Sequence, residues 1–190
     1  MASLDGDAHR WFLEQRTAAL DHFFRTVTDF GAAAVLLPLA IVLVVVLAWR
    51  RRPDLALGAT TAMIGSWLTV NLLLKPLVGR ARPPFADQLV HPGGASFPSG
   101  HAANAAAVWF TVAWAVASLT TSRAVKVTVW AGAIVIAALV GVSRLYLGVH
   151  WPSDVVAGWA IGGLWVAAGA WVAAQVRRRR AGERSEPVSR

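Results

Sequence analysis

Long apolar runs without ionic side chains dominate the chain, separated by short polar segments. Four runs contain no Asp, Glu, Lys or Arg: residues 31–49, 55–74, 102–119 and 155–176. A helix needs about 20 residues to cross the hydrocarbon core of a bilayer, so each run predicts a membrane span. A fifth uncharged run, residues 127–142, is shorter, but Lys126 at its edge can extend its ammonium toward the headgroups. The pattern predicts an all-α integral membrane bundle of five transmembrane helices.

The thirty residues before the first run follow a different pattern. Apolar residues such as Leu20 and Val27 recur there at helical spacing with charged residues between them. This pattern predicts an amphipathic helix lying along the membrane interface. A sixth, short span is the alternative, although Arg16, Asp21 and Arg25 in its middle would be costly in hydrocarbon. The segment lacks the basic-then-apolar leader of a cleavable signal peptide.

The charge distribution supports a membrane role and argues against nucleic acid binding. The formal net charge is +8, yet the basic residues flank the apolar runs and form no single basic face. The chain has no Cys, which excludes disulfides and thiolate chemistry. We therefore expect the bilayer, and no nucleic acid, as the partner of the basic residues.

The same charges predict an orientation. Five spans place the loops after the first and third span on the same side of the membrane as the C-terminus. These two loops and the C-terminal tail together hold 11 Lys and Arg residues. The opposite loops hold four: Lys75, Arg80, Arg82 and Arg144. By the positive-inside rule the C-terminus is cytoplasmic and the four cations face outward from the plasma membrane. The chain then divides into an interfacial segment (1–30), a transmembrane core (31–176) and a basic cytoplasmic tail (177–190) whose composition is typical of disorder.

The two outward loops also carry the polar residues with catalytic potential. These residues come from the ends of four spans: Lys75, Arg80, Arg82, Ser99, His101, Arg144, His150 and Asp154. Taken singly, the basic residues read as helix-end anchors and Ser99 as a helix N-cap. Together, the cations, a hydroxyl and the free N–H groups of a helix that starts at Gly100 form a site for a multiply charged oxyanion, above all phosphate. Gly100 has no side chain, so the backbone can approach the anion closely. Arg80 has no second signal and its role stays open.

Two histidines give this anion site a possible reaction. His150 and Asp154 lie four residues apart in "HWPSD", which is typical of the first turn of a helix. At that spacing the carboxylate can accept a hydrogen bond from one imidazole nitrogen and leave the other as a nucleophile. His101, on a different helix, can protonate the leaving oxygen. This arrangement describes phosphoryl transfer through a phosphohistidine. The remaining histidines are expected to be structural: His9, His22 and His91.

Three motifs make the chain resemble the type 2 phosphatidic acid phosphatase family. The first is K-x6-R-P in "KPLVGRARP", residues 75–83. The second is "PSGH", residues 98–101, and the third is S-R-x5-H-x3-D in "SRLYLGVHWPSD", residues 143–154. All three occur in order with spans between them, and the similarity covers roughly residues 20–176.

The resemblance assigns a role to each motif residue. It implies a phosphate-binding set: Lys75, Arg82, Ser99, Gly100 and Arg144. It also implies that His101 is the general acid, that His150 is the nucleophile and that Asp154 orients it. The family works without a metal or other cofactor. This fits the two outward loops, in which Asp87 and Asp154 are the only acidic residues.

A lipid phosphate is the expected substrate, because the outward loops are short and no soluble domain is present to bind a water-soluble one. By resemblance to small bacterial members, undecaprenyl pyrophosphate is the first expectation, followed by phosphatidylglycerol phosphate and phosphatidic acid. A lipid phosphate transporter and a non-catalytic binding protein are the alternatives. A transporter would be expected to show internal repeats or broken helices, and a binding protein has no need of His150 beside Asp154. The sequence leaves the oligomeric state open.

Overall fold

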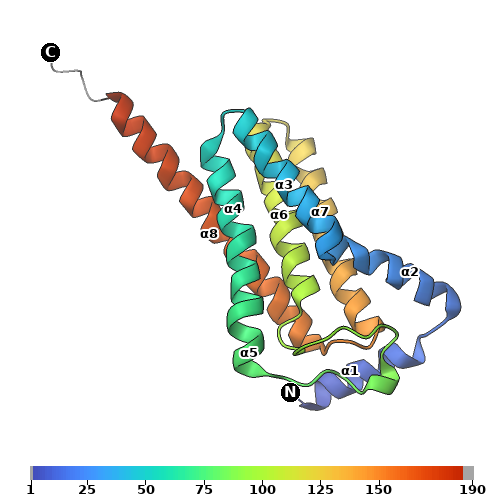
Figure 1. Cartoon of the computed structure of the whole chain (residues 1–190). Helices are drawn as coiled ribbons and strands as arrows, with labels where there is room; N and C mark the ends of the chain where they lie inside the picture. The colour runs from blue at the N-terminus through green and yellow to red at the C-terminus, as the bar shows by residue number, and fades with distance from the viewer. Residues whose placement is uncertain (1, 186–190) are drawn as a thin grey trace.

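The computed structural model describes residues 2–185, which form helices and no strand. Long helices make a bundle, with shorter helices at one end (Figure 1). The elements are α1 (Ala2–Glu14), α2 (Ala18–Thr28), η1 (Asp29–Gly31), α3 (Ala33–Trp49), α4 (Pro53–Leu68), η2 (Thr69–Leu74), α5 (Lys75–Val78), η3 (Phe85–Asp87), α6 (Gly100–Leu119), α7 (Arg123–Tyr146) and α8 (Pro152–Ser185).

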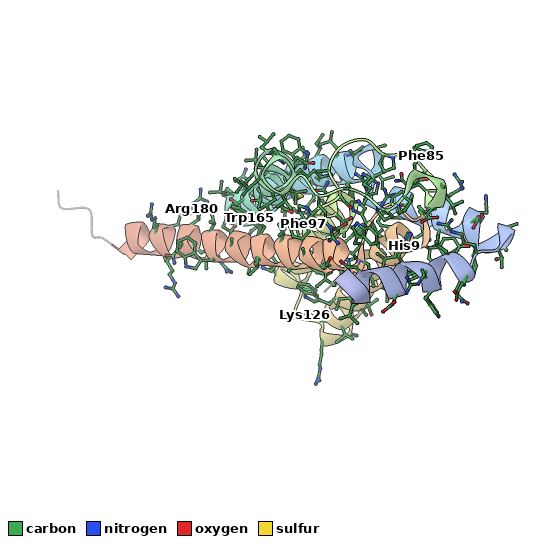
Figure 2. All side chains as sticks on the ribbon, turned by 90° about the horizontal axis from the view of Figure 1, so that it is seen from below. His9, Phe85, Phe97, Lys126, Trp165 and Arg180 are labelled. Carbon is green, nitrogen blue, oxygen red and sulfur yellow. The ribbon has the colours of Figure 1, made fainter. Side chains whose placement is uncertain are left out.

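The prediction of five spans in an all-α membrane bundle is confirmed. Within the described residues, five helical stretches are long and apolar enough to cross a membrane: Ala18–Trp49, Pro53–Val78, Gly100–Leu119, Arg123–Tyr146 and Pro152–Gly182. Large apolar side chains lie on the outside of these stretches, such as Leu72 at 63% exposure and Leu164 at 70%, as expected of surfaces that face lipid. Lys126 points away from the bundle at the start of α7 (Figure 2).

The two ends of the bundle differ in what they carry. The α3–α4 and α6–α7 connections lie at the end toward which α8 runs (Figure 1). The segment between α5 and α6 and the α7–α8 connection lie at the opposite end, together with α1 (Figure 1). The two loops that hold the candidate site residues are therefore neighbours in space, as the parity of five spans requires.

The segment before the first span forms two helices. α1 lies across the end of the bundle that carries the site loops, and α2 leads toward α3 (Figure 1). Ala32, with extended backbone (φ −79°, ψ 148°), separates η1 from α3. Phe24 of α2 packs against Tyr146 of α7 with ring centroids 4.4 Å apart. The placement of this segment in the membrane interface stays a prediction.

Helix α8 overturns one expectation. The prediction of disorder over residues 177–190 is wrong for residues 177–185, because these residues continue helix α8. Its four consecutive arginines, residues 177–180, are good helix formers and extend a helix that is already nucleated. Arg177 Nε also lies 3.6 Å from Asp54 Oδ2 at the start of α4. Residues 186–190 lie outside the described residues.

Small residues bring α6 and α8 into close backbone contact. A Cβ atom added at Gly158 of α8 would lie 2.7 Å from the carbonyl oxygen of Ser99, and one at Gly162 would lie 2.6 Å from that of Ala103. Backbones can approach this closely only where side chains are absent or small. The contact sets the first turn of α6 against the first turns of α8.

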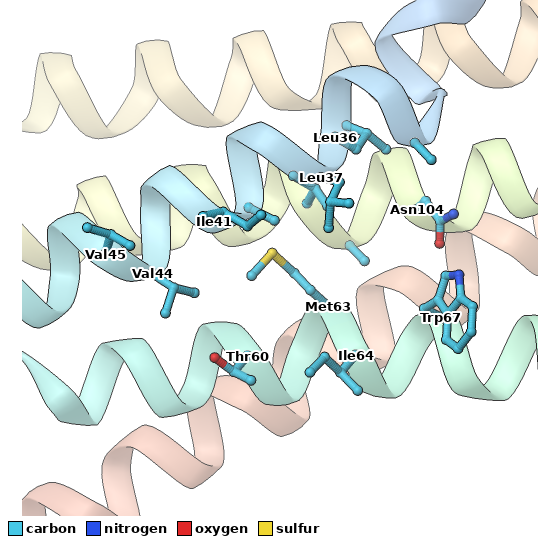
Figure 3. Close-up of a pocket in the computed structure, with 14 residues that line it drawn as sticks. Leu36, Leu37, Ile41, Val44, Val45, Thr60, Met63, Ile64, Trp67 and Asn104 are labelled. Carbon is cyan, nitrogen blue, oxygen red and sulfur yellow. The ribbon is translucent and has the colours of Figure 1, made fainter.

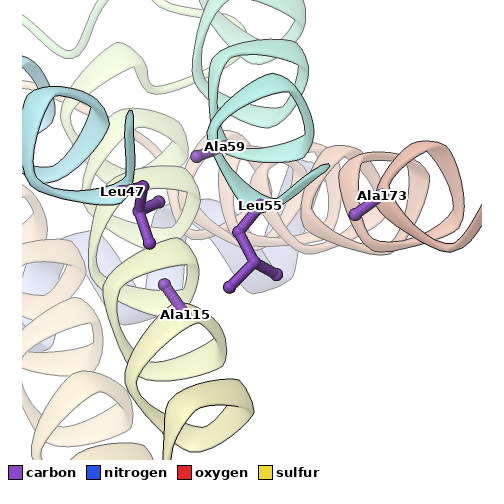
Figure 4. Close-up of a cluster of buried hydrophobic side chains, with 5 residues drawn as sticks. All are labelled: Leu47, Leu55, Ala59, Ala115 and Ala173. Carbon is purple, nitrogen blue, oxygen red and sulfur yellow. The ribbon is translucent and has the colours of Figure 1, made fainter. Parts of the chain in front are cut away.

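The far half of the bundle is held by an apolar cluster. Leu47 of α3, Leu55 and Ala59 of α4, Ala115 of α6 and Ala173 of α8 are almost fully buried there (Figure 4). Close packing of this kind makes the helices rigid with respect to one another. Side chains on four different helices can therefore keep a fixed geometry at the site end.

Candidate active site

The structure brings all the predicted site residues to the same end of the bundle. They come from separate elements that converge there: Lys75 from α5, Arg82 from the following segment, Ser99, Gly100 and His101 from the start of α6, Arg144 from the end of α7, His150 from the α7–α8 connection and Asp154 from the first turn of α8.

Lys75 is placed by an irregular stretch of its helix. Residues Thr69–Leu74 form the π-helical turn η2, immediately before Lys75, and such turns often occur at functional sites. Lys75 Nζ donates to the carbonyl oxygen of Ala95 at 3.2 Å. Its Cε lies 3.9 Å from the place where a Cβ of Gly100 would be. The ammonium therefore lies beside the start of α6.

The start of α6 has the features of an anion site. Ser99 is the N-cap, fully buried, and its Oγ accepts from the backbone N–H of Ala102 at 3.5 Å. The N–H groups of a first helical turn have no carbonyl partner within their own helix, and the helix dipole makes that end positive. His101 follows in the same turn, packs against Gly31 and interacts electrostatically with Lys75, Arg82, Arg144 and His150.

Arg82 ties the site loops together. Its guanidinium donates to the carbonyl oxygens of Gly93, Gly94 and Ala95 at 3.0–3.3 Å and to that of Val149 at 2.8 Å. Its Nη1 also lies 3.2 Å from Nε2 of His150. One cation thus holds the segment before α6 against the residue that carries the candidate nucleophile.

Arg144 is a buried cation with a donor to spare. The residue is 2% exposed and its Nη1 donates to Thr28 Oγ1 at 2.7 Å. Its Nε is buried and has no hydrogen-bond partner in the described structure. Buried polar groups are rarely left without a partner, so this N–H is a candidate donor to a phosphate oxygen. Sequence reasoning missed Thr28, because nothing near it in the chain points to Arg144, 116 residues away.

His150 is held in the neutral form. Its side chain is 2% exposed, with Nδ1 3.4 Å from Asp154 Oδ2. Burial lowers the pKa of His150 to about 4; the hydrogen bond with Asp154 opposes this shift, and the positive charges of Arg144 and Arg82 add to it. At neutral pH the imidazole therefore has a free lone pair, as a nucleophile needs.

Asp154 makes more contacts than the sequence predicted. Its side chain is fully buried, and Oδ2 accepts from Ser96 Oγ at 2.5 Å and from the backbone N–H of Trp151 at 2.9 Å. Ser96 Oγ also lies 3.3 Å from His150 Nδ1. Sequence reasoning missed Ser96, although it stands only three residues before Ser99 in "SFPSGH".

Arg80 is not a mere helix-end anchor. Its Nη1 donates to Asp154 Oδ1 at 2.7 Å and to Ser153 Oγ at 2.7 Å. Its Nη2 donates to Asp5 Oδ2 at 2.8 Å. Asp5 lies in α1, so the N-terminal segment takes part in the hydrogen bonds behind the site.

Within residues 2–185, the remaining histidines and acidic residues form no cluster of metal ligands. His9 Nε2 lies 3.0 Å from Asp87 Oδ2, and the His9 ring lies 5.3 Å from that of Trp151. His91 packs against Phe85. Among the residues that the structure describes, no group of three or more His, Asp or Glu side chains is arranged to hold a metal ion.

The family follows from a comparison that spans most of the chain. The PAP2 superfamily matches residues 55–180, a stretch that contains all three motifs. The chain belongs to the PAP2 superfamily. This confirms the resemblance inferred from the motifs.

Individual relatives are membrane phosphatases. Phosphatidylglycerophosphatase B of Bacillus subtilis (strain 168) is 38% identical over 144 residues, which are 75% of this chain and 70% of the relative. The crystal structure of a transmembrane PAP2-type phosphatidylglycerolphosphate phosphatase from Bacillus subtilis superimposes with a TM-score of 0.80 at 31% identity, covering 98% of this chain and 88% of that one. Undecaprenyl-diphosphatase of Sulfolobus acidocaldarius is 43% identical over 72 residues, 38% of this chain and 30% of the relative. This chain is accordingly a multi-pass membrane phosphatase of the PAP2 superfamily.

Proposed function

We propose that this PAP2 phosphatase hydrolyses a lipid phosphate without a metal, through a phosphohistidine formed at His150. The observation that carries the proposal is the position of His150, with Nδ1 beside Asp154 and Nε2 beside Arg82. One nitrogen is oriented by a carboxylate, and the other points at a cation that can bind the phosphate to be attacked. This is the geometry of an activated nucleophile.

The first step forms the intermediate. Nε2 of His150 attacks phosphorus, the bond from phosphorus to the lipid oxygen breaks, and His101 gives its proton to that oxygen. Lys75, Arg82, Arg144 and the start of α6 neutralise the charge on the phosphoryl oxygens. Asp154 stabilises the positive charge on the phosphorylated imidazole.

The second step releases phosphate. His101, now neutral, takes a proton from a water molecule while the water oxygen attacks phosphorus. The N–P bond breaks, inorganic phosphate leaves, and both histidines return to their starting protonation states. The same residue thus serves as acid and then as base.

An apolar groove supports a lipid as the substrate. The groove, of about 600 Å³, lies between α3, α4 and α6 and is lined by Leu36, Leu37, Ile41, Met63, Ile64 and Trp67, among others (Figure 3). Its lining includes Asn104, which stands one turn after His101 on α6. Several lining side chains are exposed on the bundle surface, such as Leu37 at 62% and Ile41 at 55%. A lipid tail in this groove would keep its headgroup close to the histidines.

The relatives favour phosphatidylglycerol phosphate as the lipid. A relative that is 38% identical over 75% of this chain, and a solved structure that covers 98% of it, are named for that substrate. Undecaprenyl diphosphate, the first expectation from the sequence, is the second candidate, supported by the relative that matches 72 residues. Both lipids present a phosphate group on an apolar tail, so the site chemistry is common to them.

The orientation of the protein belongs to the same proposal. The basic end of the bundle, with Arg50 and the arginines of α8, is placed in the cytoplasm by the positive-inside rule, and the site then faces outward. Because the chain has no Cys, each of two single variants carries one labelling site: Ala81→Cys near the site and Thr121→Cys at the opposite end. A membrane-impermeant maleimide added to intact cells should label only the first, and labelling of only the second would reverse the orientation.

The catalytic proposal is tested with purified protein and a panel of lipid phosphates. His150→Ala should lower phosphate release by more than about 10³-fold, while binding of phosphatidylglycerol phosphate persists. A chelator should leave the wild-type rate unchanged. Unaltered release by His150→Ala would contradict the nucleophile, and a loss on chelation that magnesium restores would contradict the metal-free reaction.

A further inference from the structure

Asp5 of α1 is buried and accepts hydrogen bonds from two residues that lie beside Asp154. The residue is 7% exposed, and Oδ1 accepts from the backbone N–H of Ser153 at 3.0 Å. Oδ2 accepts from Ser153 Oγ at 2.6 Å and from Arg80 Nη2 at 2.8 Å. Burial raises the pKa of Asp5, but the hydrogen bonds from Arg80 and Ser153 outweigh it and hold the pKa below its ordinary value. An ionised carboxylate from α1 thus sits at the positive end of α8.

Arg80 links this carboxylate to the one beside the nucleophile. Its two terminal nitrogens donate in different directions, Nη2 to Asp5 and Nη1 to Asp154 Oδ1 at 2.7 Å. The guanidinium also lies over the ring of Trp151, 5.5 Å from its centroid. Because the guanidinium is planar and its donors are fixed, moving one carboxylate displaces the other. The opposite oxygen of Asp154 faces His150.

The charges along this path explain what Asp5 contributes. Arg80 paired with Asp154 alone would cancel the negative charge that supports a cationic His150. With Asp5 present, two carboxylates share one guanidinium, and these three groups together keep one negative charge on the Asp154 side of the imidazole. The other charged or titratable groups around His150 are cationic or neutral: Arg82 from the segment before α6, Arg144 from α7 and His101 from α6. The carboxylate side is therefore the source of stabilisation for the charged imidazole.

We propose that Asp5 is a positioning residue: from α1 it holds Arg80, and through Arg80 it holds Asp154 in the arrangement that stabilises phosphorylated His150. The inference rests on the proposed phosphohistidine chemistry. Asp5 contacts Ser153 and Arg80 and none of the proposed phosphate-binding residues, so its effect belongs to the chemical step and not to substrate binding.

The test is the substitution Asp5→Asn, which keeps the size and the acceptor oxygen but removes the charge. We expect kcat for phosphatidylglycerol phosphate to fall about tenfold, the low end of the effect of outer-shell partners, with KM unchanged. The matched control is Asp7→Asn on the same helix, since Asp7 is exposed and, among the residues that the structure describes, pairs only with the exposed Arg10. A kcat for Asp5→Asn equal to that for Asp7→Asn overturns the inference.

A double-mutant cycle separates positioning from simple packing of α1. If Asp5 acts through Arg80, then Asp5→Asn in an Arg80→Gln background lowers kcat no further. Independent, multiplied losses would overturn the inference, and so would a loss seen only in KM. The proposed function fails separately, if the wild-type protein releases no phosphate from any lipid or if His150→Ala remains active.

Discussion

Arg82 Nη1 lies 3.2 Å from Nε2 of His150, and this contact determines which nitrogen is free to react. A guanidinium can only donate hydrogen bonds, so Nε2 is the nitrogen with the lone pair and Nδ1 carries the proton toward Asp154. The lone pair points at the cation that is proposed to bind the phosphate. A phosphate oxygen that takes over the hydrogen bonds of Arg82 would bring phosphorus to the lone pair.

Replacing Arg82 should therefore both loosen the segment before α6 and lower the rate of phosphate release. Arg82→Lys keeps the positive charge but cannot bond to several carbonyl oxygens and His150 together. We expect kcat/KM for phosphatidylglycerol phosphate to fall by about 10²-fold, as removal of one transition-state donor does elsewhere. Steady-state phosphate release measures the change. Activity within twofold of wild type would show that Arg82 only supports the loop.

The pH profile should report the lowered pKa of His150. The folded pKa of about 4 lies below the ordinary 6.5, so the imidazole stays neutral as the pH falls from 6.5 and gains a proton only near pH 4. The acid limb of kcat/KM, measured on the free enzyme, should accordingly lie near pH 4. The proposal also needs a protonated acid beside the bound phosphate, so kcat, which reports the substrate complex, should fall again at higher pH and give a bell-shaped profile.

The measurements are kcat/KM and kcat between about pH 3 and pH 9, with His101→Gln as the comparison for the alkaline limb of kcat. A monotonic profile would contradict two histidines acting in opposite protonation states. An acid limb near pH 6.5 would contradict the burial of His150 as the cause of its neutrality.

Gly158 should matter to the site even though it carries no chemistry. A Cβ atom there would lie 2.7 Å from the carbonyl oxygen of Ser99 and 3.0 Å from Ala102 Cβ. Gly158→Ala must push α6 away from α8, and overpacking of this kind costs about 1–3 kcal/mol. Because a shift of about 1 Å can cost 10²-fold in rate, we expect kcat to fall at least tenfold together with a lower unfolding temperature.

Gly163 on the same helix supplies the control. A Cβ atom added there meets nothing within 4 Å, so Gly163→Ala should leave kcat unchanged and should not lower the unfolding temperature in detergent. Equal kcat values for the two variants would show that α6 and α8 can repack without disturbing the catalytic residues.

The sequence could predict those parts of the fold and site that depend on local composition. Uninterrupted apolar runs identify membrane spans because charged side chains are costly in the hydrocarbon core of a bilayer. The number of spans then determines which loops lie on the same side of the membrane. This placed Lys75 at the same end of the bundle as His150 without knowledge of any contact. The motif order then supplied the family, which the superfamily match confirms.

The sequence could not predict the residues that act through partners far along the chain. Asp5 and Ser153 are 148 positions apart, and Thr28 and Arg144 are 116 apart. Arg80 looked like a helix-end anchor because nothing in its neighbourhood indicates Asp154, 74 residues away. Residues 177–185 looked like a tail because their arginines end the apolar pattern, although arginine continues a helix readily.

The groove between α3, α4 and α6 determines how an inhibitor would reach this enzyme. Its exposed lining, including Leu37 and Ile41, is apolar and lies on helices long enough to cross a membrane, so in a bilayer the groove would open to the hydrocarbon and not to the aqueous phase. A compound with an anionic head and one alkyl chain would first partition into the bilayer and then reach the groove by lateral diffusion within the membrane. Its potency would follow its mole fraction in the membrane, so compounds of different chain length should be ranked only after correction for partitioning.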